Sequence, residues 1–299
     1  MKETLGENEV VVHHIKTADN ARLTLTRIES ANGPGKRGPI LFAHGTFSNR
    51  TIWLNGRGRG MAAYLAAAGY DGWTLEVREH GESRRRGMEP RETSFDTWVN
   101  FDVPAAIDYV YQQTQRPLFW VGHSIGGVLI YAYLSRYPKA EEKLRGIVSF
   151  ASQAHHAGSS LKGRAMIYFT MAISRLLGYF PARRLRLGPE DEFRGVLAQW
   201  AGWNLRRRWL SLDGYDYFSG LRRIQTPVLA LVGGGDHLLA PESGCRALFE
   251  ALGSRDKQII KFSQANGHAE DYDHLSIVIG KSAPMEIWPA VESWLAERE

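Results

Sequence analysis

The stretch Leu118-Phe-Trp-Val-Gly122-His123-Ser124-Ile125-Gly126-Gly127-Val128 decides the fold of this chain. It contains a Gly-x-Ser-x-Gly motif with an apolar strand pattern before it and a helical pattern after it, which Pro138 closes. A serine on so sharp a strand-to-helix turn has a strained backbone, and we expect Gly122 and Gly126 to relieve the crowding around it because they lack a Cβ. The stretch therefore predicts a Ser124 hydroxyl exposed above a sheet edge, at the positive end of a helix.

Strand and helix patterns alternate on both sides of this turn. Short apolar runs predict strands over 39–43, 73–77, 118–121, 147–151, 227–232 and 258–262. Helical spacing predicts helices over 62–68, over 103–114, after Ser124 and over 290–296. This alternation indicates an α/β fold, with a mostly parallel central sheet and helices on both of its faces.

One long interruption separates the strand patterns. Residues 155–223 contain apolar and aromatic side chains among arginines, and no convincing apolar strand. We interpret this segment as a helical cap inserted into the sheet. The predicted organisation is therefore a core formed by residues 1–154 and 224–299, with a cap or lid formed by residues 155–223.

Composition and charge exclude several classes of protein. The chain has 299 residues, 43% of them hydrophobic and 23% charged, which excludes disordered, collagenous and coiled-coil classes. The net charge is +5, and residues 155–223 hold 11 Arg and one Lys against five acids. The positive surplus therefore belongs to the predicted cap, which argues against a nucleic-acid partner. It predicts that the cap favours anionic acyl substrates or makes weak contact with an anionic membrane surface.

Clusters of basic residues and pairs of histidines are interpreted as structural. Arg84-Arg-Arg86 and Arg206-Arg-Arg208 are short enough to be solvated loop or helix faces. His13-His14 and His155-His156 do not indicate a metal site, because adjacent side chains on a strand point to opposite faces. Cys245 is the only cysteine, which excludes an intramolecular disulfide and a cysteine-based zinc site. We expect neither a metal nor a cofactor.

The sequence offers no secretion or membrane signal that we can identify. The first twelve residues carry Glu3, Glu7 and Glu9 where a signal peptide needs an apolar stretch. The longest apolar candidate, residues 165–174, lies between two arginines and is far shorter than the ~18 residues that cross a bilayer. We expect a cytoplasmic protein.

A reactive serine needs a general base, and the base needs an acid that orients it. With this serine motif the usual order along the chain is serine, then acid, then histidine. Asp236 follows the predicted strand 227–232 and a Gly233-Gly-Gly235 turn, which is where the acid is expected. The loop Ser149-Phe-Ala-Ser-Gln153 after the preceding strand has no carboxylate, so Asp236 is the predicted acid.

Three histidines compete for the role of base. His237 adjoins the predicted acid and is expected to point elsewhere. His268 and His274 both follow the strand that ends at Phe262, and His274 lies nearer to the final helix. We favour His274 and keep His268 as the alternative.

An acyl-transfer site also needs N–H donors for the oxyanion, each worth ~2.7–4 kcal/mol to the reaction barrier. One predicted donor is the backbone N–H of Ile125, directly after the serine. The second is expected from the loop after His44-Gly45, with Thr46 preferred and Phe47 as the alternative.

The chain resembles the α/β-hydrolase superfamily over nearly its full length, and within it the acid-lipase-like branch. The motifs that carry the resemblance are Thr17-Ala-Asp-Asn-Ala-Arg-Leu23 before a first strand pair, His44-Gly45 followed by Trp53, Ala68-Gly-Tyr-Asp71, Arg78-Glu-His-Gly-Glu-Ser83, Ser94-Phe-Asp-Thr-Trp98, Asp102-Val-Pro-Ala-Ala-Ile-Asp108, Val121-Gly-His-Ser-Ile-Gly126 and Tyr272-Asp-His-Leu-Ser276 through Ala283-Pro284. The resemblance implies an α/β-hydrolase fold and the cleavage of carboxylic esters with apolar acyl parts, without a cofactor. It also implies that the histidine before Leu275, His274, is the base.

The chain departs from that family pattern at two points. Ser276 stands where an acidic residue commonly follows two positions after the base, and the cysteine pair of the eukaryotic lipases is absent. The leading hypothesis is a serine esterase or lipase-like enzyme that acts through Ser124, Asp236 and His274. Two alternatives remain, an acyltransferase that uses the same triad and a non-catalytic binding protein built on the same fold.

Overall fold

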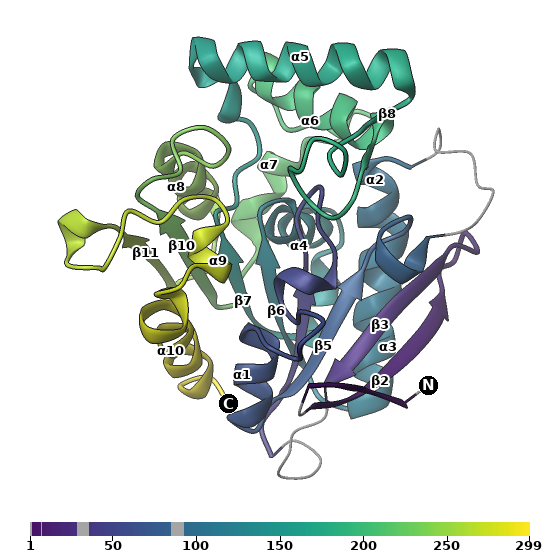
Figure 1. Ribbon diagram of the computed structural model, residues 1–299, viewed down its shortest axis with the longest axis vertical. Helices are drawn as coiled ribbons and strands as arrows, with labels where there is room; N and C mark the ends of the chain where they lie inside the picture. The colour runs from purple at the N-terminus through teal and green to yellow at the C-terminus, as the bar shows by residue number, and fades with distance from the viewer. Residues whose placement is uncertain (1, 7, 29–35, 85–92) are drawn as a thin grey trace.

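A nine-stranded sheet forms the centre of the computed structural model, which describes residues 2–6, 8–28, 36–84 and 93–299 (Figure 1). Within these residues the strand order is β1-β2-β3-β5-β4-β6-β7-β10-β11. The pairs from β1 to β5 are antiparallel, and the pairs from β5 to β11 are parallel. The strands are β1 Lys2–Leu5, β2 Asn8–Lys16, β3 Arg22–Ile28, β4 Pro39–Ala43, β5 Asp71–Glu76, β6 Leu118–His123, β7 Leu144–Phe150, β10 Val228–Gly233 and β11 Lys257–Phe262.

Helices cover both faces of this sheet because its central strands are apolar on both sides. In β4, Leu41 and Ala43 belong to the core that contains residues of α3 and α4, whereas Ile40 and Phe42 belong to the core that contains residues of α1 and α10. The predicted α/β class, with helices on both faces, is therefore confirmed. The helices of this layer are α1 Met61–Ala67, α2 Phe95–Thr97, α3 Val103–Thr114, α4 Ile125–Arg136, α8 Glu242–Ala251, α9 Ser276–Ile279 and α10 Ala283–Ala296.

The chain between β7 and β10 lies over one end of the sheet. It contains α5 Leu161–Leu177, α6 Arg194–Arg206 and α7 Tyr217–Gly220, together with two short strands, β8 Tyr179–Phe180 and β9 Glu192–Phe193, that the sequence patterns did not predict. Figure 1 shows α5 as the outermost helix, above α6 and above the carboxyl ends of the central strands. The proposed boundaries of this cap, 155 and 223, stay a prediction.

The structure differs from the sequence prediction at both ends of the chain. Residues 17–21 do not precede the first strand pair but form the turn between β2 and β3, which pair antiparallel. The last helix starts at Ala283, well before residue 290, because α10 accommodates Pro289 in its interior. Among the described helices, none has both the length and the apolar character needed to cross a bilayer.

Ser124 is the single residue between β6 and α4. Its backbone has φ 54° and ψ −123°, a conformation that non-glycine residues rarely adopt. A Cβ on Gly126 would lie 2.3 Å from the Ala43 carbonyl oxygen, and a Cβ on Gly122 would lie 2.5 Å from the Gly126 backbone. The glycines therefore allow β6, α4 and the end of β4 to approach one another. The Gly122 contact is the expected crowding within the turn, and the Gly126 contact adds the approach of β4, which the sequence did not predict.

We expect Gly126→Ala to destabilise the fold by about 1–3 kcal/mol, because the added Cβ has to displace backbone atoms at the end of β4. Gly202→Ala in α6 is the matched control, since its Cβ would meet no described atom within 4 Å. Because Gly202 lies in a helix interior, Gly202→Ala should raise the free energy of unfolding by about 0.5–1 kcal/mol. Urea unfolding of both variants measures the difference, and equal stabilities would contradict the packing argument.

Candidate active site

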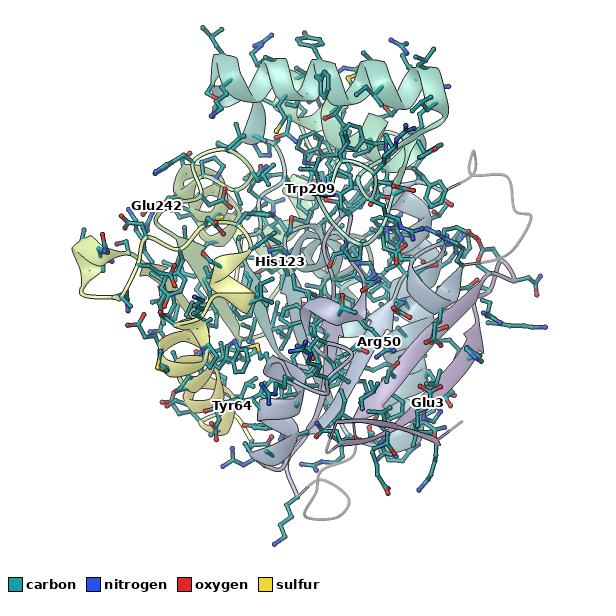
Figure 2. All side chains as sticks on the ribbon, viewed as in Figure 1. Glu3, Arg50, Tyr64, His123, Trp209 and Glu242 are labelled. Carbon is teal, nitrogen blue, oxygen red and sulfur yellow. The ribbon has the colours of Figure 1, made fainter. Side chains whose placement is uncertain are left out.

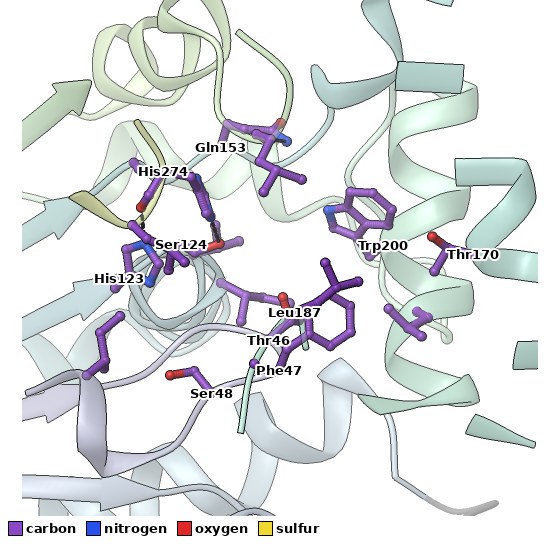
Figure 3. A pocket seen from close by; sticks show the side chains of 18 of the residues that line it. Thr46, Phe47, Ser48, His123, Ser124, Gln153, Thr170, Leu187, Trp200 and His274 are labelled. Atoms are coloured by element: carbon purple, nitrogen blue, oxygen red, sulfur yellow. Dashed lines mark hydrogen bonds between the residues drawn. The ribbon is translucent and has the colours of Figure 1, made fainter. Parts of the chain in front are cut away.

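The structure brings Ser124, His274 and Asp236 together at the carboxyl ends of parallel strands. Ser124 follows β6, Asp236 follows β10 and His274 lies in the loop after β11. His274 Nε2 is 3.0 Å from Ser124 Oγ (Figure 3). His274 Nδ1 is 2.5 Å from Asp236 Oδ2. The three side chains that the sequence singled out therefore form one continuous hydrogen-bonded chain, with the imidazole in the middle.

Asp236 is held as a carboxylate beneath the imidazole. Its second oxygen, Oδ1, accepts hydrogen bonds from the backbone N–H groups of Leu239 at 3.1 Å and Ala240 at 3.0 Å. Burial alone raises the pKa of Asp236, but the hydrogen bond and charge of His274 and the two backbone donors outweigh burial and lower it below its usual value. The carboxylate is thus ionised at neutral pH and oriented to accept the Nδ1 proton of His274.

The structure places the alternative base, His268, away from the serine. Its ring stacks on Phe262 at 4.5 Å between centroids, and its Nδ1 is 3.8 Å from the Glu286 carboxylate. His268 therefore contacts the strand end and α10, while His274 contacts Ser124.

The loop that carries His274 has its own support despite Ser276. Asp273 Oδ1 accepts hydrogen bonds from the backbone N–H groups of Leu275 at 2.9 Å and Ser276 at 2.7 Å. The Ser276 hydroxyl in turn accepts the backbone N–H of Asp273 at 2.7 Å. Asp273 and Ser276 together fix the turn, so the loop that carries His274 is supported although position 276 is not acidic.

The predicted oxyanion donors lie on two sides of Ser124. Ile125 is the first residue of α4, and Thr46 and Phe47 lie in the loop after β4; all three line the same cavity. Within the described residues, no acceptor is bonded to the backbone N–H of Ile125, of Thr46 or of Phe47, so the three are equal in this respect. All three groups are thus available to a ligand oxygen, and the choice between Thr46 and Phe47 stays a prediction.

His44 orients the loop that carries Thr46. Its Nδ1–H donates to the Gly45 carbonyl at 2.8 Å, and its Nε2 accepts the backbone N–H of Val77. Complete burial lowers the pKa of His44 to about 3, so the ring is neutral and keeps this donor and acceptor pattern. The Gly45 carbonyl points toward His44, and the N–H of the same trans peptide, that of Thr46, points the opposite way.

His123 is a positioning residue that the sequence reasoning missed. It is buried in the interior of the molecule (Figure 2), and its Nε2–H donates to the backbone carbonyl of His274 at 2.7 Å (Figure 3). Burial lowers the pKa of His123 to about 3, which keeps the ring neutral. Its place in the motif, directly before Ser124, was the signal that could have identified it. His123 links the end of β6 to the loop that carries the candidate base.

A cavity of about 260 Å³ opens beside these residues. Figure 3 shows Trp200 and Thr170 on the side away from Ser124, with Leu187 between them and the loop of Thr46 and Phe47. Apart from the histidines, none of the described lining residues is a titratable charged side chain. The lining is mainly apolar, with hydroxyl and amide groups from Thr46, Ser48, Thr51, Ser124, Gln153 and Thr170.

The histidine pairs contact different neighbours. His13 and His14 lie on β2, where His13 Nδ1 bonds the Tyr109 hydroxyl and His14 Nδ1 bonds the Thr24 hydroxyl, as expected for opposite faces. His155 and His156 do not lie on a strand, and their ring centroids are only 4.6 Å apart. The argument from strand alternation is therefore wrong for this second pair.

The two arginine clusters, residues 84–86 and 206–208, have different neighbours. Arg206, Arg207 and Arg208 are exposed at the end of α6, as predicted. Arg84 is exposed as well, and it also donates to the buried carboxylate of Glu190 at 2.9 Å. Arg85 and Arg86 lie outside the described residues.

Comparison with known proteins agrees with this geometry. The family model described as the alpha/beta hydrolase fold matches residues 38–208, more than half of the chain. The chain therefore belongs to the α/β-hydrolase family, which confirms the resemblance inferred from its motifs.

The chain is also similar to curated lipases. It is 30% identical to gastric triacylglycerol lipase of Bos taurus over 155 residues, which cover 48% of this chain and 39% of that protein. It is 32% identical to Lipase 3 of Drosophila melanogaster over 178 residues, which cover 56% of this chain and 43% of that protein. These matches thus span about two fifths of the length of the curated relatives.

Among solved structures, similarity extends over the whole chain at lower identity. A monoacylglycerol lipase of Paleococcus ferrophilus aligns with TM-score 0.64 and 20% identity, covering 93% of this chain and 99% of that one. A monoglyceride lipase of Saccharomyces cerevisiae aligns with TM-score 0.67 and 16% identity, covering 99% of each chain. At these identities the similarity establishes the fold.

We predict that the stability deficit of His123→Gln narrows as the pH falls. At pH 7 the free energy of unfolding of the variant should be about 1–3 kcal/mol below that of wild type, because the His274 carbonyl loses its buried donor. Below pH 6.5 the unfolded wild-type chain binds a proton at His123 that the folded chain does not, which destabilises wild type by ~1.4 kcal/mol per pH unit. The variant lacks this effect. Urea unfolding at pH 7, 6 and 5 measures it, and a deficit that stays constant would contradict a neutral buried ring.

Proposed function

We propose that this protein is a carboxylic-ester hydrolase that uses Ser124 as nucleophile, His274 as general base and Asp236 as the acid that orients it. The observation that carries the proposal is the continuous pair of hydrogen bonds from Ser124 through His274 to Asp236. The similarity to lipases over part of the chain supports the same reaction class.

The proposed mechanism begins with attack of Ser124 Oγ on the acyl carbonyl carbon, while its proton passes to His274 Nε2. The carbonyl oxygen becomes an oxyanion held by the N–H groups of Ile125 and Thr46. When the tetrahedral intermediate collapses, the ester C–O bond breaks and the leaving alcohol takes the proton from His274. Water then attacks the acyl-enzyme by the same route, which releases the acid and restores Ser124.

We propose a small-molecule ester with an uncharged, apolar acyl part as the substrate. The lining of the cavity is mainly apolar, and the lysine and arginine side chains of residues 155–223 are not part of it. This argues against the anionic acyl group that the charge surplus alone suggested. We further propose that residues 155–223 act as a lid, because Met166, Thr170, Leu197, Trp200 and Trp203 of this segment line the cavity above Ser124.

A fluorophosphonate probe should label the wild-type protein at Ser124, and Ser124→Ala should not be labelled. His274→Ala should lose esterase activity by several orders of magnitude, since the serine then has no base. His268→Ala is the matched control and should stay within threefold of wild type, because His268 contacts Phe262 and Glu286 instead. Hydrolysis of p-nitrophenyl esters measures the activities of His274→Ala and His268→Ala. Labelling of Ser124→Ala by the fluorophosphonate probe would overturn the choice of nucleophile.

We also propose that the outer face of α5 makes weak contact with an anionic lipid surface. Leu161 is 88% exposed, Leu176 84% and Phe169 60%. The buried residues of the helix are Ile167 and three small or polar residues, Gly163, Thr170 and Ser174. A helix that faces only water would have the opposite pattern. Residues 155–189 hold Lys162 and Arg164, Arg175, Arg183, Arg184 and Arg186 with no acidic residue, which suits an anionic bilayer.

Wild type should co-sediment with vesicles of phosphatidylglycerol and phosphatidylcholine more strongly than with phosphatidylcholine alone. Phe169→Ser with Leu176→Ser should reduce binding at least tenfold, because about 1.5–3 kcal/mol of burial is lost per side chain. Met285→Ser is the control, since Met285 is 72% exposed on α10, a helix that packs beside α9 and α1 and lies away from α5 in Figure 1. Equal binding of the double variant and the control would contradict this contact.

A further inference from the structure

The segment that follows α5 and β8 contacts the loop that carries the predicted oxyanion donors. We call residues 187–193 the cap strap and residues 45–49 the oxyanion loop. The backbone N–H of Glu190 donates to the Phe47 carbonyl at 3.0 Å. A Cβ on Gly188 would lie 2.1 Å from that same oxygen, so the two backbones are in close contact there.

The Glu190 carboxylate is buried where three donors converge. Oε1 accepts the Asn49 side-chain amide at 2.6 Å and the backbone N–H of Gly81 at 3.2 Å, and Oε2 accepts Arg84 at 2.9 Å. Asn49 is the last residue of the oxyanion loop, and its Oδ1 caps the following turn by accepting the Thr51 N–H. Glu190 thus holds the oxyanion loop at two points, Phe47 and Asn49.

The oxyanion loop needs such support because its backbone is strained. Phe47 has φ 60°, a left-handed conformation that costs a phenylalanine energy unless its surroundings impose it. The Phe47 ring packs against Phe180 of β8 at 5.5 Å. His44 fixes the peptide before Thr46, and Glu190 fixes the peptide after Phe47. The N–H of Thr46 belongs to the first of these fixed peptides, and the N–H of Phe47 lies between the two.

A second buried contact ties the cap strap to the same loop. The Glu192 carboxylate lies 3.4 Å from His80 Nε2, with both side chains fully buried. The His80 ring packs on the His44 ring at 5.1 Å, and His44 orients Gly45. The cap strap therefore reaches the oxyanion loop directly through Glu190 and indirectly through Glu192.

We propose that Glu190 is a positioning residue that sets the oxyanion loop, so that the oxyanion donors are correctly placed only while the cap strap is docked. The proposal rests on the ester-hydrolase function proposed above. Glu190 does not line the cavity, so it acts on the reaction through the oxyanion loop. Its backbone N–H holds Phe47 and remains in Glu190→Ala, whereas its carboxylate holds Asn49 and is lost in that variant.

The test compares kcat, KM and the affinity for an alkyl boronic acid, which forms a tetrahedral adduct with the serine oxygen and mimics the oxyanion intermediate. Glu190→Ala should lower kcat and boronic-acid affinity in parallel by at least tenfold, with KM for a neutral ester changed less than threefold. Glu190→Gln keeps an acceptor for Asn49 and Gly81 and should stay within threefold of wild type in both. Asp191→Ala is the matched control: it removes a neighbouring carboxylate that accepts only the Arg183 N–H among the described hydrogen bonds.

Three outcomes would overturn the proposal: unchanged boronic-acid affinity in Glu190→Ala, a loss of kcat without a matching loss of that affinity, or equal losses in Asp191→Ala. If Glu190→Ala does not fold, Gly188→Ala replaces it, because its Cβ would push the cap strap away from Phe47 while leaving Glu190 intact. It should show the same parallel losses. Failure of the proposed function is distinguishable, since a wild type that neither hydrolyses esters nor reacts with the fluorophosphonate probe leaves no activity to compare.

Discussion

The single-residue turn at Ser124 is the constraint on which the rest of the structure depends. A positive φ at this residue is stable only because β6, α4 and the end of β4 approach closely enough to enforce it, and Gly122 and Gly126 permit that approach. The same approach places the start of α4 beside the loop after β4. The position of the proposed nucleophile and those of the predicted oxyanion donors thus depend on one packing arrangement.

Buried neutral histidines connect this turn to the loops around it. His44 and His123 each use one ring nitrogen to donate to a backbone carbonyl, of Gly45 and of His274 respectively. Burial keeps both rings neutral, so each has a fixed donor. His44 and His123 exchange no proton in the proposed reaction, but they orient the loops that carry its proposed groups. His274, a side chain of the same chemical type, is the one proposed to transfer the proton.

Local patterns predicted the central strands, the α/β class and the three residues that meet at the site. These features could be predicted because each depends on nearby residues: an apolar run makes a buried strand, and parallel strands bring their following loops to one edge. The predicted start of α10 at residue 290 was wrong, because Pro289 resembles a helix boundary in the sequence but lies inside the helix. The supports at His123, Asp273 and Glu190 were not predicted, since each depends on a partner brought close only by the tertiary fold.

The contacts of Glu190 also bear on how the molecule folds and how it can be altered. Residues 47 and 190 are far apart in sequence, so their hydrogen bond requires both the loop after β4 and the segment between β7 and β10 to be in place. A correctly folded core is therefore not sufficient for a correctly shaped oxyanion loop. Under this proposal, a replacement for the segment between β7 and β10 would have to supply a hydrogen-bond acceptor at the position of Glu190.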